Sequence, residues 1–248
     1  MDNEQGLKSS PVKRRRRPHR KEIRTLAVDI GGSGIKAVVL DERGRPVTIA
    51  GRMKTPADAA PRAILQVIRR LARKQGRFDR VSVGFPGVVR GGVVYTAENL
   101  HPKWPGFNLA RKLEKILKVP VRVLNDADMQ GFGAITGRGV ELVITLGTGV
   151  GSALFIDGKL VPNLELGNDI LGGKNFQDML GNGARKKIGR KKWNRRLRRV
   201  IKALDLTFNY DNLYIGGGNS DKVDLRLPAG VRTVSNINGL LGGIVLWQ

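Results

Sequence analysis

The sequence predicts an α/β protein of two similar lobes around a cleft. Short runs rich in β-branched residues alternate with segments whose apolar residues recur at helical spacing, which is typical of mixed α/β domains. A glycine turn between two apolar runs also occurs twice, because GGSGIKAVVLD at residues 31–41 aligns without gaps on GTGVGSALFID at residues 147–157, an offset of 116 residues. The repeat indicates two related lobes that each present a glycine hairpin to a shared cleft, and a chance likeness of two hairpins is the alternative.

The first predicted lobe comprises residues 25–124. Turn residues separate its predicted strands, which are LAVDI, IKAVVL, VTIAG (residues 47–51), VSVGF, VVYT and VRVLN. A helix is predicted from about residue 59 to residue 75, because the apolar residues of this segment lie on one face. The segment LARKLEKILK is predicted to form a second helix for the same reason.

The second predicted lobe comprises residues 125–248. DADMQGFGAITG is predicted as a helix, and ELVITL and GSALFI as strands on either side of the turn GTGV. The turn DGK leads into LVPN, and LYIGGGNS is a strand that runs into a glycine turn. A basic helical stretch is predicted from about residue 175 to residue 206, with an apolar face formed by Trp193, Leu197, Val200, Ile201 and Leu204.

The first glycine turn satisfies the loose dinucleotide fingerprint G-x-G-x-x-G/A at residues 32–37. A dinucleotide-binding fold or a P-loop needs this turn to open a helix, but residues 35–40 are too rich in β-branched side chains to begin one. The acidic residue of the fingerprint is also missing. The turn is therefore interpreted as a β-hairpin whose backbone N–H groups can bind a phosphate.

Composition limits the class of protein. Of the 248 residues 40% are hydrophobic, which is enough for a substantial core, and none is cysteine, so disulfides, thiolate zinc sites and a cysteine nucleophile are excluded. With His19 and His101 as the only histidines, a histidine-rich metal site is excluded as well. No apolar run approaches the roughly 18 to 20 residues of a membrane span, and no secretory signal is seen. We expect a cytoplasmic protein with no membrane partner.

The chain is strongly basic, with 45 Lys and Arg residues against 21 Asp and Glu residues and a net charge of +24. Such a charge attracts polyanions of any kind. Residues 1–24 are predicted to form a disordered basic tail, with a nucleic-acid-binding arm as the alternative. Because no helix-turn-helix segment precedes Thr25, nucleic acid is not the favoured partner. The charged face of the basic helical stretch is either solvated or a track for a polyanion.

Several motifs occur in the order used by ROK-family sugar kinases, which the sequence therefore resembles: VDIGGSGIK, GFPG, ENL, LNDAD, TLGTGVGSALF, LELG and IGGGN. The polyphosphate glucokinase branch is the most similar, and GRKKWN also resembles that branch. The resemblance covers about residues 25–248. It implies an actin-like ATPase (ribonuclease H-like) fold and transfer of a phosphoryl group from polyphosphate, ATP or both to the 6-hydroxyl of glucose.

Site residues follow from this resemblance position by position. Asp126, where a strand meets a helix, matches the general base that takes the sugar proton. Its alternative role is to cap the helix, and Asp128 is expected to be a structural residue. The positions that correspond to sugar-binding residues are Asn99, Asn125, Asp126, Glu165 and Asn168. Asp29 resembles the residue that holds Mg²⁺ through water. No structural zinc is implied, because the cysteine cluster of the zinc-bearing members is absent.

The resemblance also implies a set of residues that bind the phosphate donor. They are Gly31, Gly32, Ser33, Gly34, Lys36, Gly147, Thr148, Gly149, Gly217 and Gly218, and Gly216 matches the nucleoside-side loop with the last two. For Lys36 a solvent-facing strand position is the alternative.

The sequence departs from the family where LELG continues into Asn168 instead of histidine. Asparagine can hydrogen-bond a hydroxyl but carries no positive charge, so sugar affinity or sugar choice is expected to differ. The alternative function is a catalytically impaired protein on a ROK kinase fold that binds polyanions or nucleic acid. We expect the protein to form a homodimer.

Overall fold

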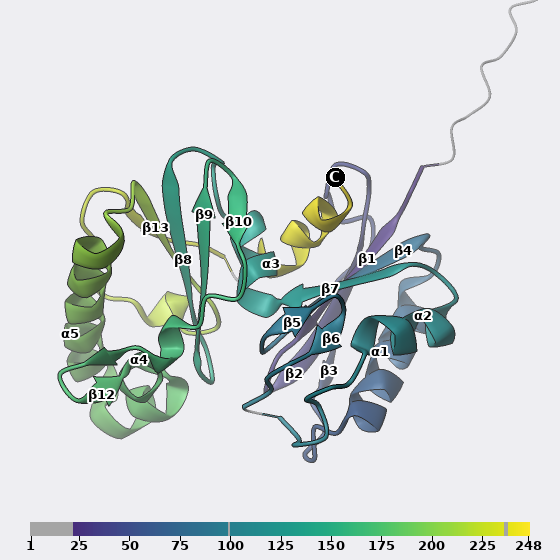
Figure 1. The fold of residues 1–248 in the computed structure, drawn as a ribbon, viewed down its shortest axis with the longest axis horizontal. Helices are drawn as coiled ribbons and strands as arrows, with labels where there is room; N and C mark the ends of the chain where they lie inside the picture. The colour runs from purple at the N-terminus through teal and green to yellow at the C-terminus, as the bar shows by residue number, and fades with distance from the viewer. Residues whose placement is uncertain (1–21, 99, 236–237) are drawn as a thin grey trace, which may run out of the picture.

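Two five-stranded sheets form the framework of the protein (Figure 1). The computed structural model describes residues 22–98, 100–235 and 238–248. Residues 1–21 of the predicted tail and the predicted site residue Asn99 lie outside this range. The first strand begins at Thr25, as the sequence predicts.

The first sheet has the strand order β3-β2-β1-β4-β7. Its strands are β1 (Thr25–Ile30), β2 (Gly34–Leu40), β3 (Gly51–Lys54), β4 (Arg80–Phe85) and β7 (Val121–Asn125). β1, β2 and β3 form an antiparallel meander, and β4 and β7 continue the sheet in parallel with β1. The helices α1 (Pro61–Gln75) and α2 (Leu109–Leu117) lie together beside this sheet (Figure 1). The apolar face of α1 packs into the core of the first sheet, as predicted.

The second sheet repeats this topology in the order β10-β9-β8-β13-β14. Its strands are β8 (Val140–Leu146), β9 (Val150–Ile156), β10 (Lys159–Val161), β13 (Asn212–Gly216) and β14 (Val231–Thr233). Again an antiparallel meander is followed by two strands in parallel with its first member. β2 and β9 also begin and end at the 116-residue offset of the sequence repeat. Two similar lobes are therefore confirmed, and chance similarity of the hairpins is excluded.

The predicted third strand, VTIAG at residues 47–51, is wrong. Only Gly51 of that segment belongs to β3, which continues to Lys54. Before Gly51 the Thr48 hydroxyl, instead of a main-chain group, accepts the N–H of Val39. The side chain of Ile49 is 93% exposed, so this segment buries no apolar residue against the sheet. The short pair β5 (Val89–Arg90) and β6 (Val93–Val94) also lies partly in a segment that the sequence predicts as a turn.

The predicted basic helical stretch is two helices, α4 (Phe176–Leu180) and α5 (Asn182–Phe208). Gly189 interrupts α5 with a φ of 76°, a conformation that glycine adopts without steric cost. The predicted apolar face of α5 is buried against the second sheet, from Trp193 to Leu204. α5 lies on the side of that sheet away from the first lobe (Figure 1). Its basic face is therefore open to solvent.

The segment DADMQGFGAITG forms a shorter helix than predicted, α3 (Asp126–Phe132), which ends before Gly133. The chain then finishes with α6 (Asn238–Leu241) and the 3-10 helix η3 (Gly242–Trp247). Leu240 and Ile244 of this segment pack with Ala27 and Leu40, so the end of the chain lies on the first sheet. Within the described residues no helix has the length and hydropathy of a membrane span.

Candidate active site

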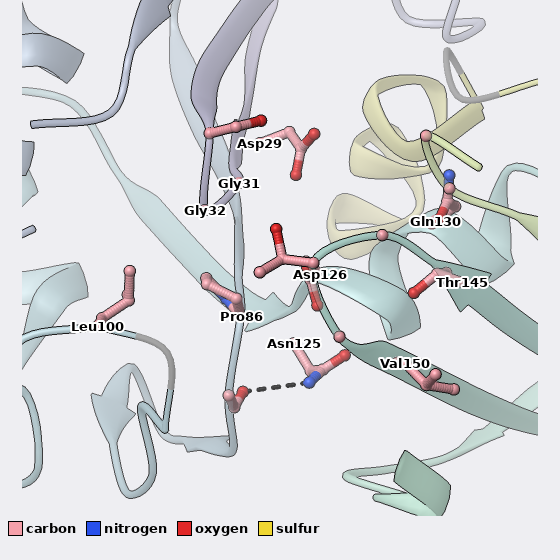
Figure 2. A pocket seen from close by; sticks show the side chains of 18 of the residues that line it. Asp29, Gly31, Gly32, Pro86, Leu100, Asn125, Asp126, Gln130, Thr145 and Val150 are labelled. Carbon is pink, nitrogen blue, oxygen red and sulfur yellow. Dashed lines mark hydrogen bonds between the residues drawn. The ribbon is translucent and has the colours of Figure 1, made fainter. Parts of the chain in front are cut away.

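A pocket of about 510 Å³ lies between the two sheets. Both glycine hairpins, the end of β7, the start of α3 and the loop after β13 line it. The predicted residues that line this pocket are Asp29, Gly31, Gly32, Ser33, Gly34, Lys36, Asn125, Asp126, Gly147, Thr148, Gly149, Glu165, Gly217 and Gly218. Segments that are far apart in the sequence therefore form a single site (Figure 2).

The two glycine turns lie close together in the lining of the pocket. In the first, the N–H of Gly31 donates to the carbonyl oxygen of Gly34 at 3.1 Å, and in the second the N–H of Gly147 donates to that of Gly149 at 3.0 Å. A Cβ atom on Gly32 would lie 3.2 Å from the hydroxyl oxygen of Thr148, so the turns approach closely because one of them lacks a side chain. This geometry suits a phosphate held between two hairpins.

Asp126 is the first residue of α3 and lines the pocket beside Asp29 (Figure 2). The helix is capped by the preceding residue, since Oδ1 of Asn125 accepts the N–H groups of Ala127 at 2.7 Å and Asp128 at 3.1 Å. Within the described ranges, the carboxyl group of Asp126 accepts the N–H of Ala127, at 2.8 Å. Capping is therefore the role of Asn125, and the carboxyl group of Asp126 is available to a ligand.

Burial and neighbouring negative charge shift the pKa values of the carboxyl groups at this site upward. Burial, and then the charge of Asp29, raise the pKa of Asp126 to about 8. Burial raises the pKa of Asp128 to about 7, with a further contribution from Glu165. Burial also raises the pKa of Asp29, although Lys36, whose Nζ lies 3.9 Å from Oδ2, acts in the opposite direction. Several negative charges are thus unfavourable together at this site, and a cation beside them would be stabilising.

Asn125 and Glu165 lie together at one end of the pocket. Nδ2 of Asn125 donates to the carbonyl oxygen of Gly87 at 3.2 Å and to Oε1 of Glu165 at 3.3 Å. The Asn125–Gly87 bond is the dashed line in Figure 2. Burial and the charge of Glu98 raise the pKa of Glu165. A carboxylate beside an amide offers the paired acceptors and donors that bind adjacent sugar hydroxyls.

Asn168 is exposed and does not line the pocket. Its Nδ2 donates instead to Oε1 of Glu98 at 3.4 Å, and Glu98 is a pocket residue. Asn168 thus reaches the site only through Glu98.

The glycine loop after β13 also lines the pocket. Gly217 has a φ of 85° and lies against the backbone of Leu146, which leaves no room for a side chain. Asn219 ties this loop to the second hairpin, since its Nδ2 donates to the carbonyl oxygen of Gly147 at 3.3 Å. Gly217 and Gly218 line the pocket, whereas Gly216 is buried and does not.

The donor set at Asp29 fits a magnesium ion held mainly by water and phosphate oxygens. Among the described residues no group of three or more His, Cys, Asp or Glu side chains could hold a metal. Mg²⁺ usually keeps several waters and binds through one or two carboxylates plus substrate phosphates. Asp29 offers one such carboxylate beside the phosphate-binding hairpin.

Several pocket residues are absent from the sequence prediction, among them Arg52, Thr96, Glu98, Gln130, Thr145 and Gln177. Arg52 was missed because the third strand was predicted at residues 47–51, which places Arg52 in the loop that follows that strand. In the observed register Arg52 lies directly opposite Lys36. A strand assigned to GRMK would have identified this residue.

Comparison with known proteins agrees with the site. The ROK family profile matches residues 25–163. The polyphosphate glucokinase of Mycobacterium tuberculosis is 33% identical over 213 residues, which are 82% of this chain and 80% of that protein. The structure of an inorganic polyphosphate/ATP-glucomannokinase from Arthrobacter sp. strain KM is 31% identical, with a TM-score of 0.84 over 90% of this chain and 98% of that chain.

A ROK family glucokinase from Streptomyces griseus is similar in fold, with a TM-score of 0.78 at 22% identity over 90% of this chain and 98% of that chain. The architecture is accordingly the actin-like ATPase fold that the sequence resemblance implies. The order of motifs, the duplicated sheets and these similarities lead to one conclusion: the chain belongs to the ROK family.

Proposed function

We propose that this protein is a sugar kinase that transfers a phosphoryl group from polyphosphate, ATP or both to the 6-hydroxyl of glucose. The observation that carries the proposal is the position of Asp126 in one pocket with two glycine hairpins. Phosphoryl transfer to an alcohol needs positioned phosphates, a cation and a base near the attacking hydroxyl. The names of the polyphosphate glucokinase and glucomannokinase relatives support the same class of reaction.

In this mechanism Asp126 accepts the proton of the sugar 6-hydroxyl as the oxygen attacks the terminal phosphorus of the donor. Asn125 and Glu165 hold adjacent hydroxyls and so orient the attacking one. The backbone N–H groups of the two hairpins and the Lys36 ammonium group hold the phosphates. Asp29 would hold Mg²⁺ through water, and the bound ion would supply positive charge to the donor phosphates.

The raised pKa of Asp126 is consistent with this role. With its pKa raised to about 8, the carboxyl group of Asp126 can hold a proton near neutral pH, whereas an ordinary Asp carboxylate is too weak a base to do so. Burial is the largest cause of the shift, and negative charge on Asp29 is the second. Positive charge beside Asp29 therefore favours ionised Asp126, which couples donor binding to preparation of the base.

The basic face of α5 supports polyphosphate as a donor. The N–H of Asn182, at the start of α5, donates to the carbonyl oxygen of Gly147 at 2.9 Å, so the helix begins at the second hairpin. Its exposed basic residues are Lys186, Lys187, Arg190, Lys191, Lys192, Arg195, Arg198, Arg199 and Lys202. A polyanion whose end lies in the pocket could continue along this face, with release of counterions.

The test is a coupled assay for glucose 6-phosphate with purified protein, glucose, Mg²⁺ and either ATP or long-chain polyphosphate. Turnover with at least one donor supports the proposal, and its absence with glucose and mannose contradicts it. In the second case the alternative, a polyanion-binding protein on a kinase fold, would still bind polyphosphate without turnover. A homodimer and a cytoplasmic location also remain predictions, which size-exclusion chromatography with light scattering and cell fractionation would test.

A further inference from the structure

We propose that Arg52 and Lys36 form a cationic pair that binds the terminal phosphate of a phosphate chain in the pocket. This inference deepens the proposed function, because it adds Arg52 to the donor-binding residues that the family resemblance implies. The shared ligand chemistry is the phosphate end of a nucleoside triphosphate or of linear polyphosphate.

Three charged residues lie in register across the first sheet. Asp29 on β1 is directly opposite Lys36 on β2, and Lys36 is directly opposite Arg52 on β3. Residues that are directly opposite one another place their side chains on the same face of a sheet. All three line the pocket, so this face is the one that the ligand meets. The two neighbouring strands therefore present two cations, side by side, to the pocket.

The charges in this row are not balanced by ion pairs within the part of the chain that the structure describes. Nζ of Lys36 lies 3.9 Å from Oδ2 of Asp29, whereas Arg52 has no ion pair with any residue in the described ranges. Like charges directly opposite on neighbouring strands are destabilising. An anion between the two side chains would turn this repulsion into two attractive interactions. The two side chains thus repel one another, and a bound phosphate would offset that repulsion.

The guanidinium group of Arg52 is positioned by the first hairpin. A Cβ atom on Gly34 would lie 2.7 Å from Nε and 3.0 Å from Nη2 of Arg52, so this group rests against the backbone of Gly34. Ser33 and Gly32 of the same turn also line the pocket. A guanidinium group presents several N–H donors in a fixed plane and can bind two phosphate oxygens at once. Arg52 and the hairpin are therefore placed to hold the same phosphate.

The first experiment measures binding without turnover. Thermal shift and calorimetry with inorganic tripolyphosphate, and separately with ATP, compare the wild type with Arg52→Gln, Arg52→Lys and the control Arg70→Gln. Arg70 is exposed on α1 and does not line the pocket. We expect Arg52→Gln to weaken binding of at least one ligand by about 10- to 100-fold, since hydrogen bonds to charged groups are strong. The ligand-free variant should be at least as stable as the wild type, because one of two repelling charges is gone.

Arg52→Lys keeps the charge and should retain part of the affinity, and Arg70→Gln should bind like the wild type. In the Lys36→Gln/Arg52→Gln double variant the loss should differ from the sum of the single losses, since both residues act on one phosphate. A loss for tripolyphosphate alone assigns the pair to polyphosphate, and a loss for ATP alone assigns it to the nucleotide. Unchanged affinity of Arg52→Gln for both ligands would overturn the inference. Arg52-dependent binding without glucose phosphorylation would retain the pair and reject the proposed kinase function.

Discussion

The side-chain amide of Asn125 donates a hydrogen bond to Oε1 of Glu165 at 3.3 Å, which joins the last residue of β7 to the residue before the 3-10 helix η1 (Leu166–Asn168). The same Asn125 side chain caps α3 through its Oδ1. One residue thus caps the helix that carries Asp126 and also contacts the carboxylate of Glu165 in the pocket. Substitution of either residue should therefore change the affinity for the sugar more than the affinity for the phosphate donor.

Replacement of Glu165 by Gln should raise the KM for glucose by about 10- to 100-fold and leave the donor KM within about twofold. The substitution removes a charged acceptor whose contribution to a hydrogen bond is about 1.5 to 3 kcal/mol. Steady-state kinetics with each substrate varied in turn would measure both values. Glu42→Gln is a suitable control, because Glu42 is exposed and lies outside the pocket. An unchanged glucose KM would remove Glu165 from the sugar site.

Asp126→Asn should lower kcat by about 100- to 10,000-fold and preserve glucose affinity within a few fold, because it removes the base and keeps the shape. Asp128→Asn is the matched comparison on the same helix. The side chain of Asp128 is fully buried, and its Oδ2 accepts the N–H of Asn163 at 3.3 Å, away from the pocket lining. This second variant should keep most of the turnover. Near wild-type kcat in Asp126→Asn would reject the assignment of the base.

The pH dependence should identify the same residue. With a pKa raised to about 8, Asp126 is protonated at lower pH, so kcat/KM for glucose should rise between about pH 6 and pH 8. The residual activity of Asp126→Asn should not show this rise.

The stability contributed by Asp126 in the ligand-free protein should fall as the pH rises, whereas kcat/KM should increase. The folded-state pKa of Asp126 lies above its ordinary value of 3.8, so folding favours the protonated carboxyl group. The stabilisation this provides is complete below the unfolded-state pKa and is lost as the pH rises to about 8. Melting temperatures of the wild type and of Asp126→Asn should therefore diverge as the pH rises, with the variant the more stable. Parallel curves would contradict the shift.

The donor should be distinguished by its response to salt. Binding of polyphosphate along α5 neutralises several phosphates at once, so its KM should rise steeply with salt concentration, whereas the KM for ATP should rise less. Replacement of Arg195, Arg198 and Arg199 by Glu should weaken long-chain polyphosphate much more than ATP. These three side chains are exposed on α5, so the fold should tolerate the change. Equal salt slopes in both proteins would make the basic face a solvated surface.

Asn168→His should change the KM for glucose or the ratio of rates on glucose and mannose. The effect is expected to pass through Glu98, because Nδ2 of Asn168 donates to this pocket residue at 3.4 Å. A histidine side chain at this position would offer Glu98 a different hydrogen-bond donor. Glu98→Gln should then reduce the difference between the asparagine and histidine proteins. If sugar KM and sugar preference both stay constant, position 168 has no part in the site.

Most of the fold follows from local patterns. Apolar periodicity identified the face of α5 from Trp193 to Leu204 and the face of α1, because a helix repeats its environment every three to four residues. The strand repeat between β2 and β9 identified the duplication. The same reasoning failed for the segment before β3. Thr48 and Ile49 have high strand propensity, but the Thr48 side chain takes the place of a main-chain acceptor and the Ile49 side chain is exposed to solvent, so neither residue belongs to the sheet.

The sequence by itself determined the two glycine hairpins, the strand–helix junction at Asp126, the basic face of α5 and the family. These depend on neighbouring residues and on the order of motifs. Only the tertiary structure decided that Arg52 lies opposite Lys36, that Asn168 contacts Glu98, and that the end of the chain packs on the first sheet. It also decided the pKa of Asp126, which depends on its burial and on the charge of Asp29 from another strand. The physical reason is that register, burial and charge separation arise when distant segments pack together, and no local pattern encodes those distances.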